Sequence, residues 1–419
     1  MTFLDELDDL AERVEQDARA TFRAAVKLLE ERAREDPRRL FKLLRTVRPV
    51  VVRNGLAIVT QYDDVREVLT RDEAFSVEPY RGKMQDLAGD FVLGTDDSPA
   101  YERDISILRL AAPRSDVPRL ADFVMQTADG MVDDANGRID VADLAKRVPA
   151  RLIDHWFGTP GPDDETMIAW TLAMFEAIFV NLKDDPEIHG RAEKAAAGLA
   201  PHLDELIAAR KASGGPADDV LGRLIAMQAS SPAAFTDEEI RKNVIGLVVG
   251  FIPTIATATT FAIDALLDRP EALASAQRVA RAGDDDALRA HVFEAMRFQP
   301  QGPGLFRKAM RDCVIAEGTH HETKLEHGTT VFAATQSAMH DDDVVDDPGD
   351  FRADRPPHHY MHFGVGLHTC FGRFASTMAI PLIAKALLRR DGLERAPGDE
   401  GALVKAGPFP QSLVVTYRP

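Results

Sequence analysis

The longest apolar stretch of this chain lies near its middle, where the 20 residues from 244 to 263 carry no charge. Directly before it, Thr236 and Glu239 have the spacing of a capping box, which is typical of a helix start. The pattern predicts one helix over 237–268, roughly 50 Å long at about 1.5 Å per residue. Its length would suit a bilayer. Because it contains glycines, Pro253 and four threonines, and no second span accompanies it, we predict a helix buried inside a soluble protein.

Shorter patterns surround this helix. Residues 49–60 hold two β-branched runs around Asn54-Gly55, the strongest short signal for a β-hairpin. Further helices are predicted at 2–46, at 63–70, across 116–230 with breaks at 158–162 and 213–216, and at 286–298, with short strands at 312–315 and 329–333. The sequence therefore predicts a mainly α protein with a small β part. Since no linker or clean boundary interrupts it, we expect a single domain over residues 1–419.

Composition narrows the function classes. The chain is 45% hydrophobic and 28% charged, which is ordinary for a globular protein. A net charge of -18 repels phosphate backbones and anionic lipid, so we expect neither nucleic-acid nor membrane binding. The two cysteines form no disulfide framework and fit a reducing compartment. With no basic and apolar leader at the N-terminus, the predicted location is cytoplasmic.

Candidate chemistry is concentrated in one glycine-rich segment, 363–372, which reads FGVGLHTCFG. Two of its glycines allow a tight turn and the close approach of a flat cofactor. Cys370 comes just before a predicted helix at 373–390, and a helix N-terminus lowers the pKa of a thiol. Gly372 leaves backbone N–H groups free to approach the sulfur. The simpler interpretation is a buried structural cysteine, but it would not explain ten positions that fit one pattern.

That pattern resembles the haem-binding loop of the cytochrome P-450 superfamily, F-G-x-G-x-[H/R]-x-C-x-G, at every fixed position. Glu294 and Arg297 resemble the family's E-x-x-R helix motif, and Glu294 lies 76 residues before Cys370. In the family these two residues form a structural pair with the segment before the cysteine loop, here expected around 351–355. The resemblance covers nearly the whole chain. It implies the P-450 fold, helical with a small β part, and one haem b (iron protoporphyrin IX) whose iron is bound by Cys370.

The resemblance also assigns contacts to the haem. His368 and Arg307 are expected to hydrogen-bond the haem propionates. A further propionate contact is expected where relatives often carry His-x-x-x-Arg, a pair that this chain lacks. Arg109 is preferred to Arg103 because it shares a helical face with Tyr101, although a solvated arginine is an equal alternative. The expected cofactor-binding residues are Cys370, His368, Arg307, Arg109, Phe363, Gly364 and Gly372, with Cys370 as the metal ligand.

The predicted central helix departs from the family. Relatives carry G-x-[DE]-T there, and the acid and alcohol deliver protons that help to break the O–O bond. An alignment on Gly250 puts Ile252 at the acid, Pro253 at the alcohol and Thr254 just beyond. Counting back from Pro270 instead puts Pro253 at the acid and Thr254 at the alcohol. Neither alignment supplies a carboxylate, and these four positions of the helix, 250 and 252–254, join Cys370 as the candidate catalytic residues.

Three functions follow from this departure and stay open. Without the acid, O2 activation should be slow, whereas hydrogen peroxide or an organic hydroperoxide already carries a protonated O–O bond. The first function is therefore a peroxide-driven oxygenation or a hydroperoxide rearrangement. The second is conventional O2-dependent monooxygenation fed by a separate ferredoxin and ferredoxin reductase. The third is a haem protein that senses or carries without catalysis.

The expected substrate is small and apolar. Its walls should come from residues 75–92, 250–254 and 301–306, whose large apolar side chains are Phe91, Phe251, Ile252, Leu305 and Phe306. Any reductase must be a separate protein, because the sequence shows no flavin or ferredoxin domain. Its docking patch could be basic, formed by Arg103, Arg109, Arg114 and Arg373, although scattered surface arginines produce such patches by chance.

Overall fold

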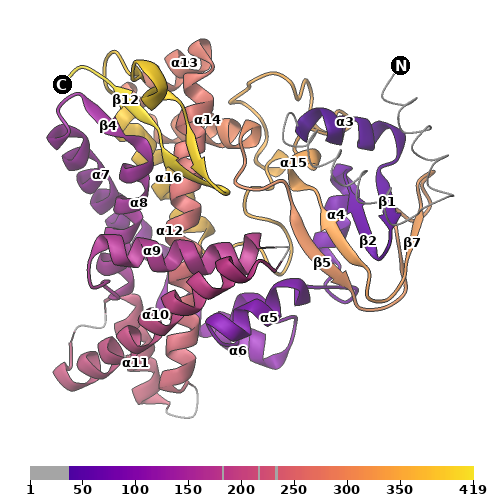
Figure 1. Cartoon of the computed structure of the whole chain (residues 1–419), viewed down its shortest axis with the longest axis horizontal. Coiled ribbons are helices and arrows are strands. Elements are labelled where there is room, and N and C mark those ends of the chain that lie inside the picture. Colours follow the sequence, from indigo (N-terminus) through magenta and orange to yellow (C-terminus); the bar gives the residue numbers. More distant parts are fainter. Residues whose placement is uncertain (1–36, 182–183, 216–217, 232–234) are drawn as a thin grey trace.

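A computed structural model describes residues 37–419 except 182–183, 216–217 and 232–234. Of the helices predicted over 2–46, the part before residue 37 lies outside this range. Figure 1 shows most helices gathered on one side of the molecule and the larger sheet, with α3 and α4, on the other. The mainly α architecture with a small β part is thus the predicted one.

The predicted central helix is present as α12 (Asp237–Leu267), and it continues through Pro253. The capping box at its start is complete, because Thr236 and Glu239 each hydrogen-bond the other's backbone N–H. Helices α8, α9, α14 and α16 pack around it, as the centre of Figure 1 shows. Among the described helices, α12 alone is long and apolar enough to cross a bilayer, and 89% of its most apolar stretch is buried inside the fold.

Helices α4, α14 and α16 follow the predicted ranges closely, whereas α5, α13 and α15 were not predicted. Helix α14 begins one residue before the predicted 286–298, with Asp284 as its N-cap. The helical region 116–230 also contains two interruptions that the sequence pattern did not reveal, at β4 (Arg138–Asp140) and between η4, which ends at Val180, and α10, which begins at Pro186. Besides α12, the helices are α3 (Pro37–Val47), α4 (Tyr62–Thr70), α5 (Glu78–Leu87), α6 (Pro99–Ala111), α7 (Val117–Asp134), α8 (Val141–Leu152), α9 (Asp164–Phe175), α10 (Pro186–Ser213), α11 (Val220–Ser230), α13 (Pro270–Ala282), α14 (Asp285–Phe298), α15 (Thr335–Ala338) and α16 (Arg373–Leu388).

Two helices end in a wider π turn. They are α8, followed by η3 (Ile153–Phe157), and α9, followed by η4 (Glu176–Val180). Short 3-10 turns form η1 (Val92–Gly94), η2 (Arg114–Asp116), η5 (Pro357–His359) and η6 (Gly398–Gly401). Single π turns inside helices often mark functional positions, and η4 lies beside α5.

The larger sheet has five strands in the order β1-β2-β8-β5-β3. The predicted hairpin forms β1 (Val50–Arg53) and β2 (Leu56–Val59), and both turn residues have positive φ, 49° at Asn54 and 76° at Gly55, as a tight hairpin turn requires. Strand β8 runs parallel to β2, whereas β5 is antiparallel to both β8 and β3. The other strands of this sheet are β3 (Phe75–Ser76), β5 (Leu305–Ala309) and β8 (Thr330–Ala333).

Three small sheets complete the β part. The predicted strand at 312–315 forms β6 (Cys313–Ile315), which pairs with β7 (Thr323–Leu325). The others were not predicted: β4 (Arg138–Asp140), β9 (Glu394–Arg395) and β12 (Val414–Thr416) form one sheet, and β10 (Val404–Ala406) pairs with β11 (Phe409–Ser412). Strands of two to four residues are too short to give a periodic signal, because pairing with distant segments stabilises them.

Candidate functional site

The glycine-rich segment forms a compact loop immediately before α16. Gly364 and Gly366 have φ of 66° and 81°, a conformation that favours glycine. A Cβ at Gly366 would lie 2.4 Å from the carbonyl oxygen of Leu69, so no other residue fits without displacing α4. The loop closes through a 2.9 Å hydrogen bond from the N–H of Cys370 to the carbonyl oxygen of Phe363. The two glycines are therefore required by this backbone, as the sequence pattern predicted.

Cys370 lies where the loop meets α16, whose N-cap is Gly372. The surrounding protein raises the pKa of the thiol, because burial disfavours the thiolate. The backbone N–H groups of Gly372 and Arg373 and the charge of Arg373 act in the opposite direction. The side chain nevertheless keeps an exposed surface. The sulfur is surrounded by protein but keeps an accessible surface, and backbone N–H groups face it. Such a thiol suits a soft metal ion, which would displace the proton.

Arg307 and His368 both carry buried nitrogen atoms without a protein partner. Arg307 on β5 is 3% exposed; its guanidinium donates to the carbonyl of Phe306, but its Nε has no partner. The Nδ1 of His368 also has none. Burial and, to a smaller extent, the nearby Arg307 charge lower the pKa of His368 to about 4, so the imidazole is neutral at pH 7. Two such unsatisfied groups near one another fit an anionic group such as a carboxylate.

The two candidate arginines, Arg103 and Arg109, both lie on helix α6 but have different surroundings. Tyr101 is buried, donates its hydroxyl to the carbonyl of Leu367 at 3.0 Å, and places its ring edge-on to His368 with centroids 5.8 Å apart. Arg109 is close enough to Tyr101 to lower the tyrosine pKa, which burial otherwise raises. Arg103 instead forms ion pairs with Asp104 and with Glu239 at the start of α12. Arg109 is thus near Tyr101 and is exposed, as a solvated arginine would be, so its contact with the haem stays a prediction.

The central helix presents one open face. Along the buried part of α12, Gly250 and Thr254 are only partly buried and lie one turn apart, whereas Ile252 and Pro253 are buried. The Thr254 hydroxyl donates to the carbonyl oxygen of Gly250 at 2.6 Å. Gly250 and Thr254 thus share the open face, and the choice between the two alignments stays a prediction. Neither Ile252 nor Pro253 lies on the open face.

These residues together fit the haem that the resemblance implies. The thiol is accessible, two buried nitrogen atoms are free for carboxylates, and a Cβ at Gly250 would meet nothing within 4 Å. A flat dicarboxylate cofactor with an iron centre could use all of these features. Cys370 would bind the metal, Arg307 and His368 would bind the carboxylates, and the face of Gly250 and Thr254 would lie opposite the thiol.

The residues of the expected substrate wall differ in their surroundings. Leu305 contacts the cysteine loop, since its Cδ1 would lie 3.5 Å from a Cβ at Gly364. Phe251, by contrast, packs against Trp156 and Phe157 at 6.0 and 5.3 Å between ring centroids. Phe251 and Ile252 are both buried, and their expected role in the substrate wall stays a prediction.

The sequence analysis missed one aromatic cluster. Phe175 and Phe179, around the π turn η4, lie against each other at 4.7 Å, and they contact Tyr80 of α5 and Phe409 of β11 at 5.5 and 6.0 Å. Lys83 of α5 also forms a 2.8 Å ion pair with Asp184. We call these four rings the aromatic roof. No sequence signal links its three segments, because they meet only through the fold.

The E-x-x-R pair is observed where it was expected. Arg297 donates to both carboxylate oxygens of Glu294 at 2.7 and 2.9 Å, and both side chains are fully buried. Glu294 also accepts from the N–H of Arg352 and the Nε of Arg355 at 2.9 and 3.0 Å, and Tyr360 donates to it at 3.1 Å. The pair therefore fixes the segment before the cysteine loop, as predicted for a structural role.

The expected basic patch is smaller than the sequence suggested. Arg114 and Arg373 flank Phe374, with guanidinium carbons 3.4 and 5.0 Å from the ring centre. Arg103 is neutralised by its two carboxylate partners, as described above. Leu110 on the same helix as Arg109 is 67% exposed. An apolar and basic surface thus lies near the α16 end that carries Cys370.

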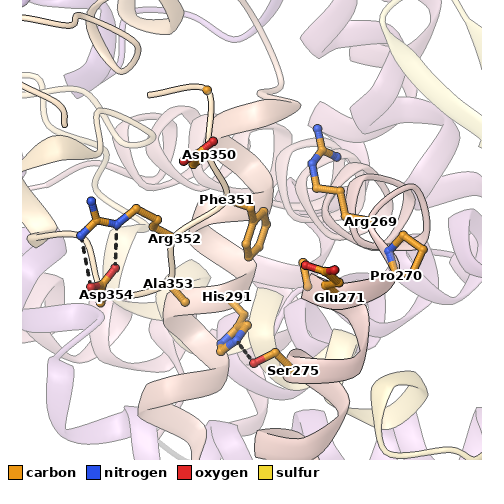
Figure 2. Close-up of a pocket in the computed structure, with 12 residues that line it drawn as sticks. Arg269, Pro270, Glu271, Ser275, His291, Asp350, Phe351, Arg352, Ala353 and Asp354 are labelled. Atoms are coloured by element: carbon orange, nitrogen blue, oxygen red, sulfur yellow. Dashed lines mark hydrogen bonds and ion pairs between the residues drawn. The ribbon is translucent and has the colours of Figure 1, made fainter. Parts of the chain in front are cut away.

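A separate surface cavity of about 1060 Å³ lies between the start of α13, α14 and the segment 349–354 (Figure 2). In this cavity His291 and Ser275 are hydrogen-bonded at 2.9 Å, and Phe351 and Arg269 form part of the wall. None of the candidate haem contacts lines it. It is therefore distinct from the site around Cys370.

Comparison with known proteins places the chain in a family. The family model of cytochrome P450 matches residues 45–414. Because this match covers most of the chain, the protein belongs to the cytochrome P450 family. It is accordingly a haem b oxidoreductase, and its fold is the cytochrome P450 fold.

Three relatives illustrate the range of the similarity. The steroid C26-monooxygenase of Mycolicibacterium smegmatis is 24% identical over 389 residues, covering 91% of this chain and 93% of its own. The crystal structure of CalO2 superposes with a TM-score of 0.79 at 23% identity, covering 92% of this chain and 97% of its own. A bifunctional dioxygenase–epoxy alcohol synthase of Pyricularia oryzae is 36% identical, but over only 115 residues, 27% of this chain and 10% of its own.

Proposed function

We propose that this protein oxidises a small, largely apolar molecule with an oxidant that already contains an O–O bond. The observation that carries the proposal is the open face of α12. It presents Gly250 and Thr254, and no acidic residue occurs on α12 between Glu239 and Asp264. Asp264, near the C-terminal end of α12, accepts a hydrogen bond from Gln299 and forms an ion pair with Arg395. A carboxylate that could pass protons at this face is therefore absent from the described part of α12.

The haem, when bound, supplies the iron and the porphyrin that cleave the O–O bond, and thiolate ligation favours that cleavage. Cys370 would hold the metal, with the N–H groups of Gly372 and Arg373 stabilising the negative sulfur. Arg307 and His368 would orient the porphyrin through its carboxylates. The Thr254 hydroxyl donates to Gly250, so its oxygen can accept a hydrogen bond from a protonated oxidant.

The overall reaction balances without an electron donor. One oxygen atom of a hydroperoxide is inserted into a C–H bond of the substrate, which loses two electrons, and the O–O bond breaks to give an alcohol or water. Where substrate and hydroperoxide are the same molecule, the result is a rearrangement. The local similarity to an epoxy alcohol synthase favours this variant. The apolar walls exclude water and orient the guest.

Conventional O2-dependent monooxygenation is the second candidate. One relative that matches nearly the full chain is named a steroid C26-monooxygenase, which favours this function. Electrons would then come from a separate ferredoxin and ferredoxin reductase, docking on the surface around Arg114, Phe374 and Arg373. Loss of catalysis, leaving a sensor or carrier, is the third candidate, favoured by the same missing acid. In each case we infer a cytoplasmic protein of one domain.

The candidates are separated by supplying the oxidant in two ways. The purified holoprotein receives a panel of apolar compounds with hydrogen peroxide or an organic hydroperoxide alone, and in parallel with ferredoxin, its reductase, NAD(P)H and O2. We expect turnover in the first mixture. Turnover only in the second contradicts the peroxide proposal, and spectral binding without turnover in either supports the sensor.

A further inference from the structure

The segment between α5 and α6 is seated on the first turns of α12 through an unusually close contact. The ring of Phe91 lies directly on Gly246: a Cβ there would be 2.3 Å from Cδ2 and 2.4 Å from Cε2 of the ring. Phe91 is 4% exposed, so the contact is fully enclosed. Only glycine at 246 allows the ring to reach this depth.

Two flanking contacts hold Phe91 in place. The N–H of Val92 points to the Oδ1 of Asn243 at 3.5 Å. A Cβ at Gly89 would be 2.6 Å from the Cε of Lys242, so the lysine stem packs onto the glycine. The segment is thus clamped to α12 on both sides of the ring, and the ring position is fixed by backbone contacts.

Residues 243, 246, 250 and 254 follow one another along a single face of α12, since they are three or four residues apart. This face changes character between two adjacent turns. At Gly246 it is filled by the Phe91 ring, whereas at Gly250 a Cβ would meet nothing within 4 Å. The open part of the face therefore begins one turn, about 5.4 Å, beyond the phenylalanine.

From this change we propose that Phe91 is the end stop of the substrate pocket along α12, and that Gly246 is a specificity-determining residue because it lets the ring lie there. The inference rests on the proposed substrate site at Gly250 and Thr254. A bound molecule cannot extend along α12 past Gly250 and must place any long part elsewhere. The pocket thus selects guests that are short on the side of Phe91.

The test measures binding and needs no oxidant. A series of n-alkylimidazoles of increasing chain length is titrated into the holoprotein, and the haem absorption shift gives each dissociation constant. In Phe91→Ala we expect the longest members to bind at least about tenfold tighter than in the unmodified protein, the gain from burying roughly two more methylenes. Imidazole itself should bind equally to both proteins.

Gly246→Ala should have the opposite effect. Its methyl group forces the ring of Phe91 toward the open face at Gly250, so long alkyl chains should bind at least fivefold more weakly, while imidazole is unaffected. The double variant G246A/F91A should regain the preference of Phe91→Ala, because the clash is gone. Phe91→Leu, a milder truncation, repeats the test should Phe91→Ala not fold.

Phe235→Ala is the matched control. Phe235 is 2% exposed and precedes α12, so its truncation removes an equally buried ring outside the proposed pocket. It should lower the melting temperature without changing the chain-length preference. If the Phe91 variants and Gly246→Ala also lower the melting temperature and leave the chain-length preference unchanged, Phe91 is only a packing residue and the proposal is overturned. Because no turnover is measured, a failure of the peroxide proposal would leave this result interpretable.

Discussion

The hydroxyl of Thr254 donates a 2.6 Å hydrogen bond to the carbonyl oxygen of Gly250, one turn earlier on α12. Both residues are partly buried in a stretch of helix that is otherwise buried. The bond links the two residues that form the open face of α12, and Pro253, directly before the threonine, is buried.

Pro253→Asp should shift the balance between the two oxidants. The substitution restores a backbone N–H inside α12 and puts a carboxylate beside Thr254. General acid–base groups contribute about 10²- to 10⁴-fold. Because position 253 is buried and adjoins the open face without lying on it, we expect a gain at the low end, about tenfold, in the ratio of O2-driven to peroxide-driven turnover. Pro253→Ala restores the N–H without the acid and should leave the ratio unchanged. Equal ratios in both variants would show that proton supply at 253 does not limit O2 use.

Cys370→Ser should abolish the spectrum of a thiolate-ligated haem. The hydroxyl of serine is a poor ligand for iron because it stays protonated, whereas a thiol loses its proton on metal binding. The measurement is the difference spectrum of the reduced protein with carbon monoxide, together with haem content per chain. The matched control is Cys313→Ser, which changes the second cysteine on β6. An unchanged spectrum in Cys370→Ser would refute the assigned ligand.

The two glycines of the cysteine loop should differ in their tolerance of alanine. Gly366→Ala meets both a φ of 81° and a Cβ 2.4 Å from the Leu69 carbonyl, so the loop must move and haem retention should fall sharply. Gly364→Ala has a similar φ of 66° but a nearest contact of 3.5 Å, so it carries only the backbone cost of about 1–2 kcal/mol. The measurements are the haem content and melting temperature of the two variants, and both should be lower in Gly366→Ala than in Gly364→Ala.

His340 should make the protein sensitive to acid. It is 7% exposed, and burial together with Arg297 lowers its pKa to about 3. Since the unfolded chain has a histidine pKa near 6.5, the unfolded state binds more protons between pH 6.5 and 3. The contribution of neutral, buried His340 to the free energy of unfolding is therefore fully present above about pH 6.5 and is lost as the pH falls towards 3.

The variant His340→Leu isolates this effect. In the unmodified protein the Nε2 of His340 has no partner, so the change to leucine removes one hydrogen bond, the 3.0 Å bond from Nδ1 to the carbonyl of Gln336. Between pH 7 and 4.5 the unmodified protein should lose roughly 2–3 kcal/mol more of its free energy of unfolding than the variant. Urea unfolding at both pH values measures the difference. Parallel losses would mean that His340 titrates normally in the folded protein.

Local patterns in the sequence determined the elements that are stabilised locally. The capping box of Thr236 and Glu239, the Asn54-Gly55 turn and the glycines of the cysteine loop each describe a backbone conformation that few other residues permit, so their structure could be predicted. The pairing of Glu294 with Arg297 was also accessible, because residues three apart share a helix face. Cys370 stood out for the same reason: its neighbours define a tight loop before a helix.

Only the tertiary structure decided which side of α12 is open. An apolar helix surrounded by other helices shows no periodic difference between its faces, so Phe251 looked as suitable for the pocket as Thr254. Packing against Trp156 and Phe157 buries Phe251. The contact of Phe91 with Gly246 closes the face of Gly250 and Thr254 one turn earlier on α12. The aromatic roof depends likewise on segments more than 200 residues apart, from Tyr80 to Phe409. Such contacts depend on how distant elements pack, and local propensity carries no information about them.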